Sequence, residues 1–150
     1  MIFVTVGTTQ FDDLIRNMDQ LAASDRFGQD ILCQIGNGKY VPEHCDYFRF
    51  APSINPQINA AQLVVTHGGA TTLQLIKEAK RFVALANTRL ADDHQSSFLR
   101  HLSECTDLVW GRDPAQVGDL IEQALAAPLP KIHSPSLGQA IIADVYQEAN

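Results

Sequence analysis

A histidine, two glycines and three small residues separate a strand-like run from a helix-like run in VVTHGGATTLQL, residues 64–75. A helix N-terminus presents unpaired N–H groups and a partial positive charge, and glycines let a ligand approach the backbone closely. The junction therefore suits a diphosphate, which would lie against His67, Gly68, Gly69, Ala70, Thr71 and Thr72. The same residues also fit a tight strand-to-helix turn in which His67 is an ordinary hydrogen-bonded side chain. The stretch alone leaves both interpretations open.

A second polar cluster, Asp92-Asp93-His94-Gln95, precedes another helix-like run. Carboxylate, imidazole and amide groups together supply donors and acceptors that can bind several hydroxyls of a sugar. The alternative is an N-cap aspartate with exposed polar neighbours, which needs no ligand. Both interpretations place this cluster directly before a helix.

Familiar nucleotide and nucleophile motifs do not occur in the sequence. GNGKY, residues 36–40, lacks the spacing of a P-loop, and GTTQFDD does not match GxGxxG. Without a GxSxG elbow, the HGG run is not expected to form the oxyanion hole of an esterase. The three cysteines, Cys33, Cys45 and Cys105, lack CxxC spacing, so we expect reduced, packed thiols and no metal site.

Hydrophobic patterning predicts the elements that must position these clusters. Apolar runs predict strands at residues 2–6, 30–35, 46–50, 62–66, 82–86 and 108–110. Helical spacing predicts helices at 11–23, after the HGG turn, after the DDHQ cluster with Phe98, Leu99 and Leu102 facing inward, after Asp113-Pro114, and at 134–149. Pro52 and Pro56 are expected to break any regular element after the third strand.

Strands that alternate with helices at this spacing predict an α/β fold with a Rossmann-like, doubly wound and mostly parallel sheet. Such sheets bind ligands outside the carboxyl ends of their strands. We therefore expect the loops at 7–10, 36–40, 51–55, 67–72 and 87–95 to converge.

The composition is that of a globular protein with a length near one domain, and we expect residues 1–150 to form a single domain. A net charge of −6 excludes a protein that holds nucleic acid by neutralising its phosphates, because that requires a basic face. The first residues lack the basic region of a signal peptide and an apolar run long enough to cross a bilayer. The expected location is the cytoplasm.

Four segments together resemble a known family: FVTVGTTQFDDLI, QIGNGKYVPEHCDYFRFAPSI, AQLVVTHGGATTL and DDHQ. They are similar to the small, donor-binding catalytic subunit of two-part GT-B glycosyltransferases, which corresponds to the glycosyltransferase family 28 C-terminal domain. This group includes the subunit that adds the second N-acetylglucosamine to dolichyl-diphosphate-GlcNAc, and bacterial subunits of exopolysaccharide and capsule synthesis. The resemblance runs from residue 1 to about residue 112 and implies a GT-B C-terminal-domain fold and a UDP-sugar-dependent, inverting transferase.

The resemblance also implies where the donor lies. The loop from Phe50 to Ile54, with Ser53, would border uracil. The diphosphate would lie against Gly7, Thr8 and Thr9 and the turn at 67–72, and the sugar would meet Asp93, His94 and Gln95. No cofactor or metal is implied, because helix dipoles and backbone amides stabilise the departing UDP. His67 and His94 are candidate general bases, and a base on a partner is equally consistent.

In this family a membrane-anchored subunit brings a lipid-linked acceptor, so the resemblance implies such a partner and a peripheral location at the inner face of the membrane. The predicted helix at 134–149 carries an apolar stripe that would either close the domain's own core or dock on that partner. An isolated chain could also form a homodimer through this stripe.

The sequence departs from the family pattern after the HGG turn. Gln74 stands where a ribose-binding glutamate is expected, and Ala79-Lys80-Arg81 replaces Gly-Lys-Pro. A neutral acceptor makes hydrogen bonds roughly half as strong as those of a carboxylate. The alternative function is therefore a catalytically degenerate nucleotide-sugar-binding or scaffold subunit of such a complex.

Overall fold

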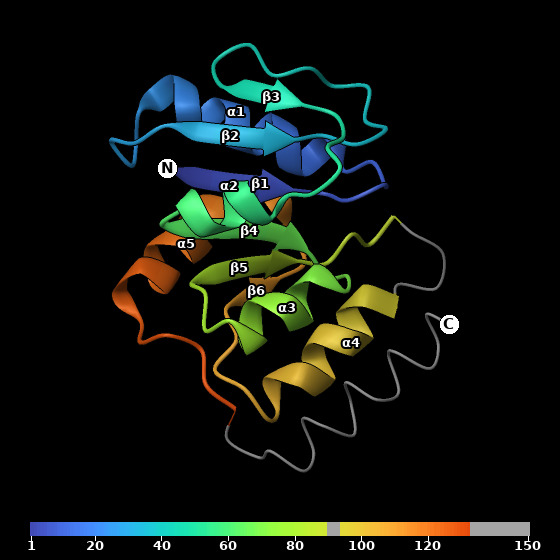
Figure 1. Cartoon of the computed structure of the whole chain (residues 1–150), viewed down its shortest axis with the longest axis vertical. Coiled ribbons are helices and arrows are strands. Elements are labelled where there is room, and N and C mark those ends of the chain that lie inside the picture. Colours follow the sequence, from blue (N-terminus) through green and yellow to red (C-terminus); the bar gives the residue numbers. More distant parts are fainter. Residues whose placement is uncertain (90–93, 133–150) are drawn as a thin grey trace.

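In the computed structural model, which describes residues 1–89 and 94–132, six strands form one sheet in the order β3-β2-β1-β4-β5-β6 (Figure 1). The strands are β1 (Ile2–Thr5), β2 (Ile31–Gln34), β3 (Asp46–Phe48), β4 (Leu63–His67), β5 (Phe82–Leu85) and β6 (Trp110–Gly111). Every neighbouring pair in this sheet is parallel. The prediction of a Rossmann-like, parallel sheet is confirmed, and the order is that of the Rossmann fold.

The sheet is centred on β1, which pairs with β2 on one side and with β4 on the other. Ile2 is in register with both Ile31 and Leu63, and all four residues of β1 are buried. The direction in which the chain fills the sheet reverses between β1 and β4. Doubly wound sheets bind their ligands at this switch point, beyond the carboxyl ends of the two strands.

The described helices are α1 (Asp12–Ser24), α2 (Asn55–Ala60), α3 (Thr71–Lys77), α4 (His94–Ser103), the 3₁₀ helix η2 (Pro114–Gln116) and α5 (Val117–Ala126). They cover both faces of the sheet (Figure 1). Side chains of α1 and α5, such as Met18 and Ile121, pack in one core with Val4 of β1. Side chains of α2, α3 and α4 form the second core with Phe3, the neighbour of Val4. The two cores follow from the alternation of side chains along a strand.

The end of α5 is held by a cation from the start of β5. The Arg81 guanidinium donates from Nη1 to the carbonyl oxygens of Ala124 and Ala127, the second at 2.6 Å. The last carbonyls of a helix lack intrahelical donors and carry partial negative charge, so a guanidinium satisfies both requirements. Arg81 therefore fixes α5 against the amino edge of the sheet.

The expectation that Pro52 and Pro56 exclude regular structure after β3 is wrong for Pro56. Helix α2 starts at Asn55 and contains Pro56 in its first turn, where the missing N–H has no intrahelical partner to lose. Ile58 is fully buried in the second core, and this packing gives the short helix its stability. The sixth strand also begins later than predicted, at Trp110.

The predicted terminal helix at 134–149 and the residues Asp92 and Asp93 lie outside the described residues. Among the helices of residues 1–89 and 94–132, none is long and apolar enough to cross a membrane.

Candidate functional site

Two turns face each other at the switch point, one after β1 and one after β4. Gly7, in the first turn, has φ +64°, and a Cβ added to it would lie 3.2 Å from His67 Nε2. A Cβ added to Gly69, in the second turn, would lie 2.4 Å from His67 Cε1. The imidazole of His67 therefore occupies the space between the two turns, and glycine is required at Gly69 because any side chain would displace the ring.

The first turn is held by Gln34, a residue that the sequence did not single out. Its Oε1 accepts from Thr5 Oγ1 at 2.6 Å and from the amides of Val6 and Gly7, both at 3.0 Å. Its Nε2 donates to the carbonyl oxygens of Gly7 at 2.8 Å and Arg49 at 2.7 Å. Because Gln34 is only 3% exposed, its amide joins the turn after β1 to the segment after β3 and is not available as a ligand contact.

One feature of the sequence could have identified Gln34 as a structural residue: its amide side chain stands at the last position of the otherwise apolar strand ILCQ. A buried polar side chain at a strand end must find partners, and the nearest unpaired backbone groups are in the turns beyond that edge.

The rest of the first turn is also fixed through its backbone. Thr9 Oγ1 donates to the carbonyl of Val6 at 2.8 Å, and Asn37 Nδ2 donates to the carbonyl of Thr8 at 2.8 Å. The Thr8 side chain is exposed at the carboxyl edge of the sheet. The predicted diphosphate contacts at Gly7, Thr8 and Thr9 thus lie together, opposite His67.

The second turn is joined to the loop after β5 by Gln95, the second residue of α4. Gln95 Oε1 accepts from the amides of Gly68 at 3.1 Å and Asn87 at 2.8 Å, and its Nε2 lies 3.1 Å from His67 Nδ1. Asn87 is 2% exposed and donates through Nδ2 to the carbonyl of Gln10 at 2.9 Å. The loops after β1, β4 and β5 are thereby connected, as the predicted convergence requires.

The start of α3 has no side-chain cap, and residues 69–71 are exposed or half-buried. Within the described residues, the backbone bonds of this turn begin with Thr72 N to Gly69 O and Leu73 N to Ala70 O, both at 3.1 Å. No side chain caps α3, whose N-cap residue Ala70 is exposed. Thr72 itself is buried and donates to the carbonyl of His67 at 3.3 Å, so its hydroxyl serves the turn. The amides of Gly69, Ala70 and Thr71 are the donors available to an anion.

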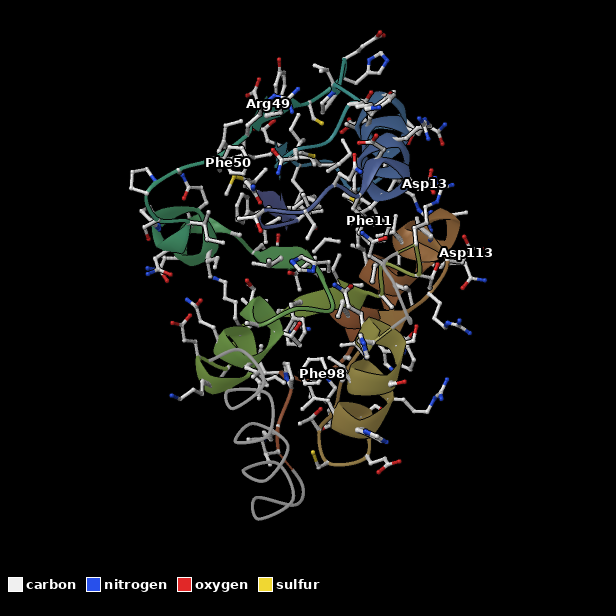
Figure 2. The ribbon with its side chains drawn as sticks, turned by 90° about the vertical axis from the view of Figure 1, so that its right-hand side faces the viewer. Phe11, Asp13, Arg49, Phe50, Phe98 and Asp113 are labelled. Atoms are coloured by element: carbon white, nitrogen blue, oxygen red, sulfur yellow. The ribbon has the colours of Figure 1, made fainter. Side chains whose placement is uncertain are left out.

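A second group of predicted residues lies where α2 and α3 meet. Gln74 Nε2 donates to Asn55 Oδ1 at 2.8 Å and lies 3.3 Å from Glu78 Oε1. Ser53 Oγ accepts from the amide of Asn55 at 3.2 Å. Ser53 and Gln74 therefore share the neighbour Asn55, which sequence reasoning did not identify. Phe50, on the same side of the molecule, is 54% exposed (Figure 2).

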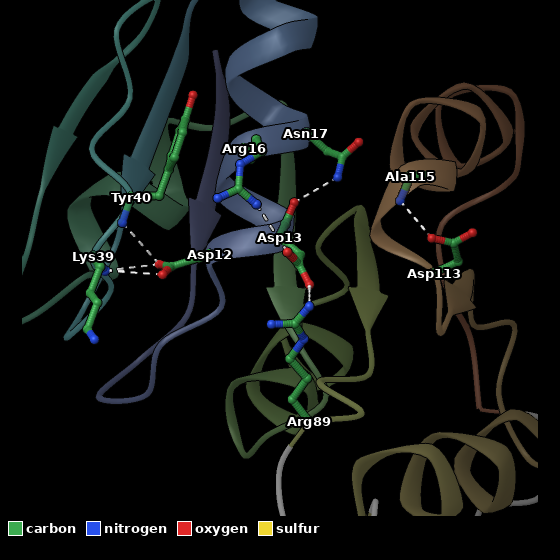
Figure 3. A network of polar contacts seen from close by, with 9 residues as sticks. All are labelled: Asp12, Asp13, Arg16, Asn17, Lys39, Tyr40, Arg89, Asp113 and Ala115. Atoms are coloured by element: carbon green, nitrogen blue, oxygen red, sulfur yellow. Dashed lines mark hydrogen bonds and ion pairs between the residues drawn. The ribbon is translucent and has the colours of Figure 1, made fainter.

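A cavity of about 270 Å³ lies beside the residues that follow the first turn. It is lined by Gln10, Phe11, Asp12, Asp13, Lys39, Asn87 and Arg89. Arg89 pairs with Asp13 at 2.9 Å, and Asp13 also pairs with Arg16 at 3.2 Å (Figure 3). Asp12 accepts from the amides of Lys39 and Tyr40, at 3.0 and 3.3 Å (Figure 3). This cavity lies at the carboxyl edge of the sheet and is slightly smaller than the ~300 Å³ lower bound typical of small-molecule pockets.

Another cavity, of about 420 Å³, lies at the opposite edge, beside Arg81, Phe82 and Val109. These residues stand at the amino ends of β5 and β6. Because ligands of doubly wound sheets bind at the carboxyl ends, this cavity is not the candidate site.

The charge state of the site follows from burial. Desolvation by burial lowers the pKa of His67, which favours the neutral imidazole at pH 7. His94, the first residue of α4, is exposed, and Asp93 lies outside the described residues. Within residues 1–89 and 94–132, no three His, Cys, Asp or Glu side chains are grouped so that they could hold a metal ion. The cysteines of the chain are free thiols.

The fold and these two turns define a class of protein. Residues 1–125 match the glycosyltransferase family 28 C-terminal domain, and the chain belongs to this family. The recognition made from the four sequence segments is confirmed.

The chain is similar to two curated proteins named UDP-N-acetylglucosamine transferase subunit ALG13. It is 35% identical to the protein from Homo sapiens over 123 residues, which cover 70% of this chain and 11% of that protein. It is 30% identical to the protein from Mus musculus over 122 residues, which cover 69% of this chain and 10% of that protein. The chain thus spans about a tenth of the length of these relatives.

An NMR solution structure of ALG13 has a similar fold. The TM-score is 0.58 with 15% sequence identity, and the match covers 97% of this chain and 96% of that one.

Proposed function

We propose that this chain is the donor-binding subunit of a glycosyltransferase that uses a UDP-sugar, with UDP-N-acetylglucosamine the first donor to test because the relatives carry that name. The single observation that carries this proposal is the pair of turns at the switch point, where the His67 ring lies beside Gly7 and the second turn leads into the uncapped start of α3. A helix start with available amides and a neutral imidazole donor suits a diphosphate. Family membership supplies the reaction class.

In the proposed mode the diphosphate lies between the two turns and uracil lies beside Phe50 and Ser53. Gln74 reaches the ribose from α3, and the sugar extends toward Asp93 and His94. Transfer with inversion builds negative charge on the departing UDP, and fixed amides at the turn stabilise it without reorganisation. We propose no metal and no cofactor for this step. The general base is His94 or a group on the partner, with His67 as the third candidate.

The acceptor is proposed to come from a membrane-anchored partner subunit that holds a lipid-linked acceptor. This assigns the chain to the cytoplasmic face of a membrane, in polysaccharide or lipid-linked glycan assembly. In the absence of the partner, the chain could self-associate.

Titration calorimetry with UDP, with and without EDTA, tests the site. We expect binding that EDTA leaves unchanged. Ala70→Glu places a carboxylate at the exposed start of α3 and should weaken UDP binding about tenfold or more, because one charge-assisted hydrogen bond is worth that much. Ala23→Glu, at an exposed position of α1, is the matched control. No binding at millimolar UDP, or wild-type affinity in Ala70→Glu, would overturn the proposal.

A second candidate function is a non-enzymatic, nucleotide-sugar-binding subunit. It is favoured by the position of Gln74, whose amide is engaged by Asn55 and Glu78. Co-expression with the partner subunit and an assay of sugar transfer separate the two functions. UDP binding without transfer by the assembled pair would establish the second.

A further inference from the structure

The side-chain amide of Gln95 makes three polar contacts that together fix its orientation. Oε1 lies 3.1 Å from Gly68 N and 2.8 Å from Asn87 N, and Nε2 lies 3.1 Å from His67 Nδ1. A backbone N–H can only donate, so the atom that faces Gly68 and Asn87 must be the carbonyl oxygen of Gln95. An amide flipped by 180° would direct NH₂ at two N–H groups, and this arrangement is excluded.

The orientation of Gln95 determines the tautomer of His67. The amide nitrogen of Gln95 carries only hydrogens to give, so it donates to His67 Nδ1, and Nδ1 must be an unprotonated acceptor. A neutral imidazole has one N–H, which must then lie on Nε2. Burial keeps the ring neutral, since desolvation lowers the pKa of His67.

The protonated nitrogen faces the first turn. A Cβ built on Gly7 would lie 3.2 Å from His67 Nε2, and one built on Gly69 would lie 3.2 Å from the same atom. The absence of side chains at both glycines keeps this space free of Cβ atoms. The N–H of the ring is thus presented at the gap between the two turns.

We propose that Gln95 is a positioning residue that fixes His67 as a neutral Nε2–H donor, directed at an anionic oxygen bound between the turns after β1 and β4. The ligand in this statement rests on the proposed function, whereas the tautomer does not. His67 in this state cannot accept a proton from an acceptor hydroxyl, because Nδ1 is occupied and Nε2 is protonated. The general base of the proposed reaction is therefore a different group.

Nitrogen-15 NMR of the histidine ring tests the tautomer in the free protein. For wild type at neutral pH, His67 should show an unprotonated Nδ1 and a protonated Nε2. Gln95→Glu keeps an oxygen for Gly68 and Asn87 but replaces the amide donor with an acceptor, so Nδ1 should become protonated. Gln20→Glu, at an exposed position of α1, should leave the His67 signals as in wild type.

A protonated Nδ1 on the neutral ring of wild type would overturn the inference without any variant, so the test survives a Gln95→Glu protein that does not fold. A folded Gln95→Glu protein with the wild-type tautomer would also overturn it.

Titration with UDP tests whether the Nε2–H group of His67 contacts the ligand. UDP should shift the Nε2 signal of wild type, and Gln95→Glu should bind UDP about tenfold or more weakly, whereas Gln20→Glu should bind as wild type. If the wild-type protein shows the expected tautomer but does not bind UDP, the proposed function is refuted and the inferred role of Gln95 is retained. Normal UDP binding with the opposite tautomer would refute only the role of Gln95.

Discussion

Replacement of Gln34 should destabilise the protein in a way that depends on which half of its amide is changed. The carbonyl half accepts from Thr5 and from the amides of Val6 and Gly7, and the NH₂ half donates to the carbonyls of Gly7 and Arg49. Gln34→Leu removes both halves, whereas Gln34→Glu keeps the acceptor and converts the donor into a second oxygen. The pair of variants therefore separates loss of hydrogen bonds from electrostatic repulsion.

The expected magnitude for Gln34→Leu follows from the groups left without partners. Each buried donor or acceptor that loses its partner costs about 1–3 kcal/mol, and Gly7 alone loses one of each. We expect a loss of roughly 3–6 kcal/mol, which is a large fraction of the ~5–15 kcal/mol that stabilises a typical domain. For a chain of this length that lowers Tm by roughly 10–20 °C.

Gln34→Glu should show a pH dependence that Gln34→Leu lacks. Its second oxygen would face the carbonyls of Gly7 and Arg49, now 2.8 and 2.7 Å from Nε2, so the neutral acid is favoured in the folded state. A carboxyl whose folded pKa is raised destabilises the fold increasingly as pH rises above its unfolded value, about 4.3. The stability deficit should be small near pH 4 and grow toward neutrality.

Thermal and urea denaturation followed by circular dichroism between pH 4 and 8 measures both effects, with Gln20→Glu on the exposed side of α1 as the control. A Gln34→Leu protein within about 0.5 kcal/mol of wild type would refute the assigned network, since changes of that size are typical of surface sites. So would a Gln34→Glu deficit that stays constant over the whole pH range.

Three other substitutions have defined expectations. Burial acts to raise the pKa of Asp19, but hydrogen bonds from Glu43, Tyr40 and His44 outweigh this effect and lower the pKa. Asp19→Asn should therefore cost about 2–3 kcal/mol of stability at pH 7. Urea denaturation should show that this loss shrinks as pH falls below about 4. Arg81→Met removes the cation at the end of α5 and should cost about 1.5–3 kcal/mol by urea denaturation, with an unchanged m-value. Gly69→Ala places a Cβ 2.4 Å from the ring of His67 and should weaken UDP binding about tenfold or more by calorimetry.

Each of these has a matched control at an exposed position. Asp30→Asn, Arg100→Met and Ala23→Ser should leave stability close to wild type, because their side chains are exposed. An Asp19→Asn deficit that does not narrow in acid, an Arg81→Met protein as stable as Arg100→Met, or a Gly69→Ala protein with the UDP affinity of Ala23→Ser would contradict the corresponding argument.

The sequence by itself determined the elements, the fold class and the edge of the sheet that carries the candidate site. Strands β1 and β4 each begin with three apolar residues, because helices cover both faces of a parallel sheet, and that requirement is visible in a short run of residues. The carboxyl ends of parallel strands all meet at one edge, so polar turns that follow strands must gather there. His67 and Gly7 were placed together on this basis.

Tertiary structure alone decided what the individual amides do. Gln34 and Gln95 have the same functional group as a sugar-binding or ribose-binding glutamine, yet their amides hold backbone groups of other loops, including Gly7 and Gly68, each 27 residues away in the chain. A proline such as Pro56 can end a helix or lie in its first turn. Here Pro56 lies in the first turn of α2, and the burial of Ile58 stabilises that helix. In each case the free energy depends on a partner that packing brings within 3 Å or so, and no local pattern of residues encodes that distance.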